Sequence, residues 1–128
     1  MLPHKKIKML DLCSGDSFVL NYVGDYIDEY IGVDNNEKYL SKLKSKWPNF
    51  KFINSNISGL DSLSILNNYK PDIIFMNGAI HHLDNGIMNS INLFISKFEK
   101  TIFLSVDPIK YKNKLLNKIM IFLDRGKF

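Results

Sequence analysis

The sequence of 128 residues lacks the features that mark secreted, zinc-binding and membrane proteins. Its single cysteine, Cys13, excludes both an internal disulfide and a zinc site built from cysteines. No stretch approaches the ~18 consecutive apolar residues that a membrane-spanning helix needs. Residues 1–6 do not form the apolar core of a secretion signal. We therefore expect a single cytoplasmic domain over residues 1–128, with no membrane partner.

The sequence is also poor in arginine, and Arg125 is the only one although the net charge is +4. The positive excess is local, because residues 97–128 carry eight basic and three acidic residues while the rest carries nine and ten. A basic segment can bind nucleic acid or an anionic membrane surface. Arginine supplies the bidentate contacts to bases, so its scarcity disfavours nucleic acid. A solvated helix face is the simpler explanation of this charge.

Strand-like and helix-like segments alternate along the chain. The strands are expected from continuous apolar runs, at residues 7–13, 29–34, 50–54, 71–77 and 100–106. The helices are expected at residues 17–23, 36–46, within 58–69, at 86–98 and at 110–124. Five strands separated by helices predict an α/β fold, with an open and mainly parallel sheet covered on both faces. Ligands of such sheets bind beyond the carboxyl ends of the strands.

The turn after the first expected strand contains small residues and carboxylates. Small residues let the backbone approach a ligand closely. A dinucleotide loop of the type G-x-G-x-x-G would need glycines where Cys13 and Phe18 stand. Asp11 and Asp16 would also repel a pyrophosphate. The turn therefore favours a neutral or cationic ligand, and a plain turn with Gly15 at positive φ is the alternative.

Polar residues also end the second and third expected strands. Asp34 lies 19 residues after Gly15, and a carboxylate there can accept two hydrogen bonds from the hydroxyls of a ribose. The alternative is a helix N-terminal aspartate that is stabilised by the helix dipole. Asn56 has an amide that can pair with an adenine edge, or it is a simple turn residue.

Two adjacent histidines, His81 and His82, follow the fourth expected strand. On a helix, adjacent side chains point roughly 100° apart, so the two cannot easily face one small ligand. A metal site would need more nitrogen or sulfur ligands, and only His4 and the distant Cys13 remain, so we expect no metal. One histidine is a candidate acid, base or positioning group, with a surface or capping role as the alternative.

Four motifs together resemble those of the class I S-adenosylmethionine-dependent methyltransferases. They read MLDLCSGD at 9–16, YIGVD at 30–34, NSNI at 54–57 and DIIFMNGAIHHL at 72–83. Their order and spacing are those of the family. The resemblance implies a Rossmann-like three-layer sandwich of about five strands in the order 3-2-1-4-5, without the last two strands of the family.

The resemblance also implies roles for residues at the strand ends. Asp11 and Gly15 match positions that line the methionine part of S-adenosylmethionine (SAM), and Cys13 and Ser17 replace glycines of the same motif. Asp34 matches the acid that binds the ribose. The remaining implied cofactor contacts are Asn35, Asn56 and Ile57 near the adenine and Asn77 beside the methyl donor.

The implied function is methyl transfer from SAM to a small-molecule acceptor, which leaves S-adenosylhomocysteine (SAH). His82 matches the second histidine of the "HHL" pattern of small-molecule methyltransferases, so it is the first candidate base, followed by His81 and Asp107. A base is needed only where the acceptor loses a proton. Without further strands, residues 100–106 would form an apolar sheet edge that can pair with a second copy of the chain.

Three other functions stay open at this point. The first is a truncated, non-catalytic module that binds the cofactor or a partner. The second is a nucleotide-dependent oxidoreductase, which the missing glycines disfavour. The third is an RNA-associated protein that uses the basic C-terminal segment.

Overall fold

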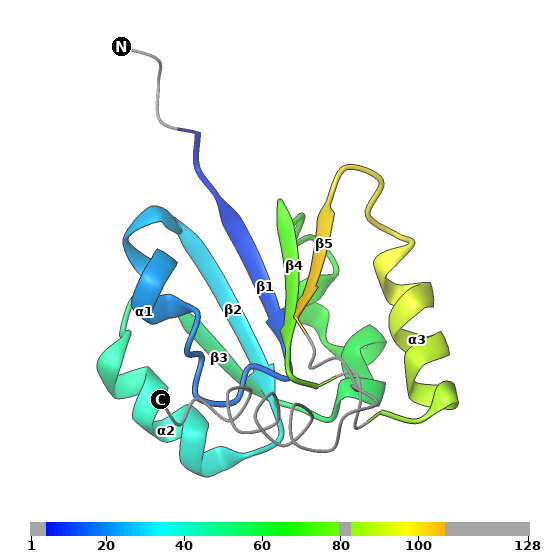
Figure 1. Cartoon of the computed structure of the whole chain (residues 1–128), viewed down its shortest axis with the longest axis horizontal. Helices are drawn as coiled ribbons and strands as arrows, with labels where there is room; N and C mark the ends of the chain where they lie inside the picture. The colour runs from blue at the N-terminus through cyan, green and yellow to red at the C-terminus, as the bar shows by residue number, and fades with distance from the viewer. Residues whose placement is uncertain (1–4, 80–82, 107–128) are drawn as a thin grey trace, which may run out of the picture.

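The computed structural model describes residues 5–79 and 83–106, which form one sheet with helices on both faces (Figure 1). Five strands, all parallel, lie in the order β3-β2-β1-β4-β5. They are β1 (Lys8–Leu12), β2 (Glu29–Asp34), β3 (Lys51–Asn54), β4 (Ile73–Asn77) and β5 (Ile102–Val106). The expected strand segments and their order are confirmed.

The helices between the strands are short. They are α1 (Leu20–Val23), α2 (Glu37–Lys46) and α3 (Asn85–Ile95), with the 3₁₀ helices η1 (Gly24–Tyr26), η2 (Ile57–Ser62) and η3 (Ser64–Leu66). The helix expected within 58–69 is thus replaced by two 3₁₀ turns, because serine, asparagine and glycine in this segment favour turns over α-helix. The helix expected at 110–124 lies outside the described residues. Within the described ranges, no helix is long and apolar enough to cross a bilayer.

Side-chain caps explain where the two longer helices begin. The Asn36 side chain accepts hydrogen bonds from the backbone N–H groups of Lys38 and Tyr39, at 3.1 and 3.4 Å. The Asp84 carboxylate accepts one from Ile87 N–H at 2.8 Å. Such caps satisfy N–H groups that have no partner inside the helix.

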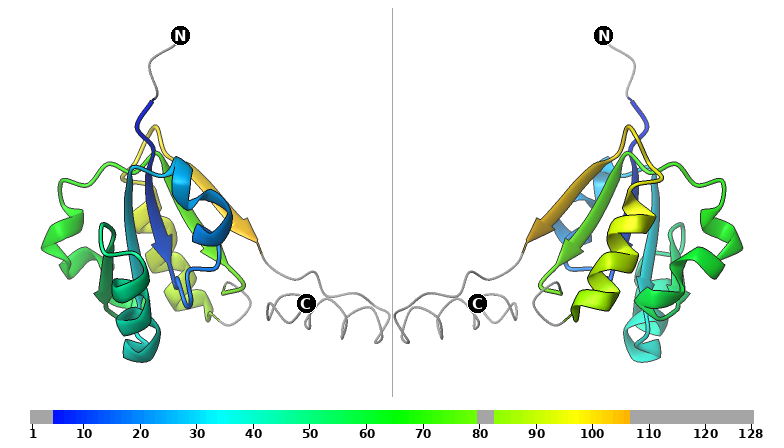
Figure 2. Two further views of the ribbon diagram at one scale, coloured as in Figure 1. Left: turned by 90° about the vertical axis from the view of Figure 1, so that its left-hand side faces the viewer. Right: turned by 90° about the vertical axis from the view of Figure 1, so that its right-hand side faces the viewer.

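The sheet separates two apolar cores, which makes the molecule a three-layer sandwich (Figure 2). Successive side chains of a strand point to opposite faces, so β1 directs Met9 to one core and Leu10 and Leu12 to the other. The first core includes residues of α1 and α2, namely Leu20, Leu40 and Leu43, with Tyr30 and Phe52 from the sheet. The second includes Leu60 and Leu66 from the 3₁₀ turns and Ile91 and Phe94 from α3. The expected coverage of both faces is confirmed.

The register brings the carboxyl ends of the strands to one edge of the sheet. Leu12 of β1 pairs with Val33 of β2, and Asp34 pairs with Asn54 of β3. The segments that follow these strands therefore lie side by side. This edge is where ligands of parallel α/β sheets bind.

The strand β5 is the outer edge of the sheet in the described part of the chain. Phe103 packs against the second core, whereas Ile102, Leu104 and Val106 lie on the opposite face and are 59%, 46% and 56% exposed. The apolar edge that the sequence predicts is therefore present.

Candidate functional site

The turn after β1 has a backbone path that is normal for glycines, although only one glycine is present. Cys13, Gly15 and Ser17 have φ values of 56°, 54° and 50°. Residues with a side chain rarely adopt this left-handed region, which costs about 1–2 kcal/mol each. Cys13 and Ser17 stand where the resemblance expects glycines. The turn therefore has the conformation of a glycine loop at all three alternate positions.

Asp34 connects this turn to the end of β2. Gly15 N–H donates to Asp34 Oδ2 and Asn36 N–H donates to Asp34 Oδ1, both at 2.8 Å. The side chain is half-buried. A carboxylate has about four lone-pair sites, so each oxygen can accept one more hydrogen bond. Asp34 is thus held in one orientation and can still accept hydrogen bonds from a ligand.

Asp11 lies beneath the turn, not on an open rim, because its side chain is only 2% exposed. Tyr30 Oη donates to Asp11 Oδ2 at 2.5 Å and lies 2.8 Å from Ser17 Oγ. A phenol has one proton, so with this donor role Tyr30 must accept its second bond from the Ser17 hydroxyl. This buried triad supports the turn from the face that α1 and α2 cover.

Burial raises the pKa of Asp11 from 3.8 to about 7. The hydrogen bond from Tyr30 opposes this rise, while the charges of Asp34 and Asp16 add to it. Burial and the neighbouring Asp11 likewise raise the pKa of the Tyr30 phenol. Near neutral pH the Asp11 carboxyl group is therefore partly protonated and partly ionised, while the Tyr30 phenol stays protonated.

Cys13 is half-buried and packs against the second core. Burial, with the charges of Asp34 and Asp11, raises the pKa of its thiol to about 11. The thiol is therefore protonated at neutral pH and is a poor nucleophile. Its contribution to the site is its small size and its backbone conformation.

The residues expected near an adenine follow β2 and β3 on the same edge. Ser55 N–H donates to the Asp34 carbonyl at 3.0 Å, which holds the turn containing Asn56 beside Asp34. The Asn56 side chain accepts a weak bond of 3.3 Å from Ser58 N–H, so the alternative role of a turn residue is observed. Asn35 is exposed and Ile57 is half-buried against the second core.

The end of β4 contributes Asn77, whose side chain is exposed. Gly78 follows with a φ of 64°, and its N–H donates to the Val106 carbonyl at 2.7 Å. The candidate bases His81, His82 and Asp107 lie outside the described residues. Within residues 5–79 and 83–106, no three His, Cys, Asp or Glu side chains are grouped so that they can hold a metal.

The structure therefore brings the first-turn residues and Asp34 together, with Asn35 and Asn56 next to them. The supporting roles of Tyr30 and Ser17 were not predicted. The register of β1 with β2, which pairs Met9 with Tyr30 and Asp11 with Gly32, places Tyr30 and Asp11 on the same sheet face, and the sequence pattern does not contain this register.

No protein-family model matches this sequence, and a search of the curated proteins finds no match either. Many solved structures, in contrast, are similar to this chain. A TehB-like SAM-dependent methyltransferase from Corynebacterium glutamicum is 14% identical with a TM-score of 0.65, and the match covers 79% of this chain and 54% of that one. The CurJ carbon methyltransferase is 15% identical with a TM-score of 0.72, and the match covers 97% and 34%.

A third similar structure is DhpI, which was solved with SAM and, separately, with SAH. The SAM complex is 12% identical with a TM-score of 0.67, and the match covers 92% of this chain and 54% of DhpI. The chain thus has the fold of SAM-dependent methyltransferases and spans about half the length of these proteins or less. The fold that the sequence motifs implied is confirmed.

Proposed function

We propose that the chain binds SAM at the carboxyl edge of β1 and β2 and acts in methyl transfer to a small-molecule acceptor. The observation that carries this proposal is the turn at Cys13, Gly15 and Ser17, whose left-handed backbone is tied to Asp34 by the Gly15 N–H bond. This turn allows the close backbone approach that a ligand needs, and it lies on the binding edge of the fold.

The residues present fit a nucleoside with a cationic end. The free lone pairs of Asp34 can accept the hydroxyls of a ribose. Asn35, Asn56 and Ile57 lie on the adjoining turns, where an adenine would extend. Asp11, Asp16 and Asp34 lie close enough for the charges of the last two to raise the pKa of the first. This local negative charge favours a sulfonium and opposes a pyrophosphate, which argues against the oxidoreductase alternative.

When bound, SAM supplies a methyl group that is activated by the positive charge on sulfur. The task of the protein is then to orient the acceptor in line with that methyl group and to exclude water. We assign Asn77, at the end of β4, to the edge of this space. His82, His81 or Asp107 would accept a proton where the acceptor must lose one.

A second candidate function is a cofactor-binding or partner-binding module without catalytic activity. It requires only the turn at Cys13, Gly15 and Ser17 with its bond to Asp34, and no acceptor site. A homo-oligomer formed through the exposed edge of β5, a single domain over residues 1–128 and a cytoplasmic location belong to the proposal as well.

Calorimetric titration tests cofactor binding. We expect SAM and SAH to bind and NAD to give no heat. Asp34→Ala is expected to weaken SAM binding by about 2 kcal/mol or more, because it removes a charged hydrogen-bond acceptor. Asp34→Asn retains one acceptor oxygen, so its affinity for SAM is expected to lie between those of Asp34→Ala and the unmodified chain. Asp25→Asn, which removes an exposed carboxylate of η1, is the matched control.

Equal SAM affinity in Asp34→Ala and the unmodified chain would refute the ribose assignment, provided that circular dichroism shows both proteins folded. Transfer is tested separately, with isotopically labelled methyl-SAM and a pool of small metabolites. Label in a product supports the enzyme, and SAM binding without labelled product supports the non-catalytic module.

A further inference from the structure

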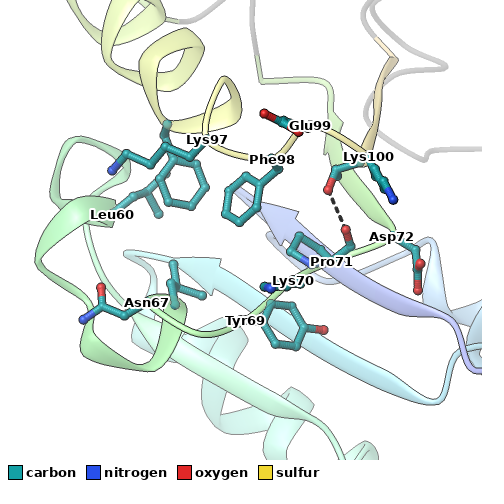
Figure 3. A pocket seen from close by; sticks show the side chains of 13 residues that line it. Leu60, Asn67, Tyr69, Lys70, Pro71, Asp72, Lys97, Phe98, Glu99 and Lys100 are labelled. Carbon is teal, nitrogen blue, oxygen red and sulfur yellow. Dashed lines mark hydrogen bonds between the residues drawn. The ribbon is translucent and has the colours of Figure 1, made fainter.

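A cavity lies where β4 and β5 begin, at the opposite end of the strands from the turn that we assign to SAM (Figure 3). Its volume is about 630 Å³, which lies within the ~300–1,000 Å³ of typical small-molecule pockets. The connection from η3 to β4 forms one wall, and the end of α3 with its following loop forms the other. The cavity is therefore separate from the turn that we assign to SAM.

The unusual connection between β3 and β4 explains why this space is open. Two short 3₁₀ turns stand where the sequence predicts a longer helix. They bury Leu60 and Leu66 in the second core, but they leave a hollow between η3 and the end of α3.

The floor of the cavity is aromatic and held in place. The rings of Phe94 and Phe98 pack edge to face with centroids 5.3 Å apart, and Figure 3 shows Phe98 at the centre of the cavity. The Tyr69 hydroxyl donates toward the carbonyls of Met9 at 3.2 Å and Glu29 at 3.4 Å. Its ring is therefore fixed by its far end and offers a flat apolar surface to a ligand.

The rim of the cavity carries an excess of positive charge. Asp72 accepts a bond from Lys8 N–H at 3.0 Å and pairs with the Lys5 ammonium at 3.5 Å, so its charge is partly compensated. Lys70 and Lys100 are exposed, and neither forms an ion pair with another residue of the described ranges.

Two further charged groups lie along the same rim. The Lys97 ammonium lies over the Phe94 ring, 5.7 Å from its centroid. Glu99 is the one remaining carboxylate among the lining residues besides Asp72. Lys70 and Lys100 thus add two ammonium groups to a rim whose carboxylates are Glu99 and the partly compensated Asp72, and this rim favours an anion.

We propose that this cavity binds a small amphipathic carboxylate. Its flat apolar part lies against Phe98 and Tyr69, and its carboxylate lies near Lys70 and Lys100. The lysines supply charge-assisted hydrogen bonds to the carboxylate, and the aromatic rings supply the buried contact area.

The test uses the full chain and 2-naphthoate as the probe, with its neutral analogue 2-naphthalenemethanol, followed by NMR titration. We expect the carboxylate to bind at least about tenfold more tightly than the alcohol. The double variant Lys70→Met, Lys100→Met is expected to lose this preference. The matched control is Lys42→Met, Lys44→Met on α2, which removes the same charge elsewhere and is expected to bind as the unmodified chain does.

Phe98→Leu tests the aromatic floor, since it preserves apolar volume while it removes the ring. It is expected to weaken naphthoate binding several-fold with an unchanged far-ultraviolet circular dichroism spectrum. The proposal is overturned when naphthoate shows no binding up to millimolar concentration, when it binds no better than the alcohol, or when the double lysine variant binds it normally. Displacement of naphthoate by SAH would also overturn it, because the probe would then occupy the other edge of the sheet.

Discussion

The Asp11 carboxyl group is almost fully buried, yet it lies close to the carboxylates of Asp16 and Asp34. It receives one hydrogen bond, from Tyr30, and its neighbours Asp34 and Asp16 carry charge of the same sign. Water cannot stabilise its ionised form, so the proton stays on the folded protein well above the ordinary pKa of an aspartate.

We expect the free energy of unfolding to fall as pH rises from about 4 to about 7 because of Asp11. Its pKa is 3.8 when exposed and about 7 in the fold, so in this window the folded state holds a proton that the unfolded state has released. Each pH unit then lowers the stability by at most about 1.4 kcal/mol, and the effect ends above pH 7. Urea unfolding between pH 4.5 and 8 measures it.

The comparison that isolates this effect is Asp11→Asn, because asparagine does not titrate. The stability of the unmodified chain relative to Asp11→Asn is expected to decline through the window. Asp25→Asn, an exposed change of the same kind, is expected to keep the slope of the unmodified chain. Parallel profiles for Asp11→Asn and the unmodified chain would show that Asp11 does not carry this pH dependence.

At this scale the sequence predicted positions better than contacts. Gly15 and Asp34 were both assigned to strand ends that bind the cofactor, and the two share a hydrogen bond. Asp11 was expected to border the ligand, but it lies under the turn. The partner of a buried carboxylate depends on the strand register and on the tilt of a side chain such as Tyr30, and a linear pattern contains neither.

The turn, β2 and β3 meet at Gly32, where there is no space for a side chain. A Cβ atom there would lie 3.0 Å from Tyr30 Cε1, 3.1 Å from Phe52 Cδ1 and 3.1 Å from Ser14 Oγ. Both rings belong to the first core and are almost fully buried. The close contact of these three elements therefore depends on glycine at this position.

Gly32→Ala is expected to destabilise the fold by about 1–3 kcal/mol, because two packed rings and a turn must shift to admit one methyl group. Thermal and urea unfolding measure the loss. Gly86→Ala in α3 is the matched control, since its Cβ would meet a single atom, Asp84 Oδ1 at 3.3 Å, and no packed ring. Equal stability of Gly32→Ala and the unmodified chain would show that the rings yield easily.

The element scale is also where sequence patterns were most reliable. Every expected strand is present, because buried parallel strands consist of continuous apolar residues. The helix expected within residues 58–69 is not formed. This segment has too few apolar residues at helical spacing to outweigh its turn-forming serines, asparagines and glycine. Leu60 and Leu66 of the resulting 3₁₀ turns line the cavity at the start of β4 and β5, so this error concealed a candidate site.

As a whole, the described structure ends in an apolar strand edge. Ile102, Leu104 and Val106 expose their side chains, and β5 is the outermost strand of the sheet in the described part of the chain. Native proteins usually protect such edges with charge, with a bulge or with another chain. Within β5 there is no charged side chain, since its sequence is IFLSV, and its pairing with β4 runs from Ile102 to Val106 without a bulge.

We expect the chain to self-associate through β5 in a concentration-dependent way, which sedimentation velocity measures. Leu104→Lys is expected to reduce the association, because it places a charge on the edge. Leu93→Lys is the matched control, because Leu93 is 69% exposed and belongs to α3, not to a strand. A monomer at all concentrations, or equal association of both variants, would contradict the prediction.

The hydrogen bond from Gly15 to Asp34 has a thermodynamic consequence for recognition. The bond joins the turn to β2 before a ligand binds. Few backbone dihedrals then remain to be ordered when the ligand binds, so the entropic cost of binding is small. The Asp34 carboxylate thus has two roles: it accepts hydrogen bonds from the proposed ligand, and it fixes the turn through Gly15. Its removal frees the loop as well as deleting a contact, so the loss of affinity should contain an entropic part that calorimetry resolves.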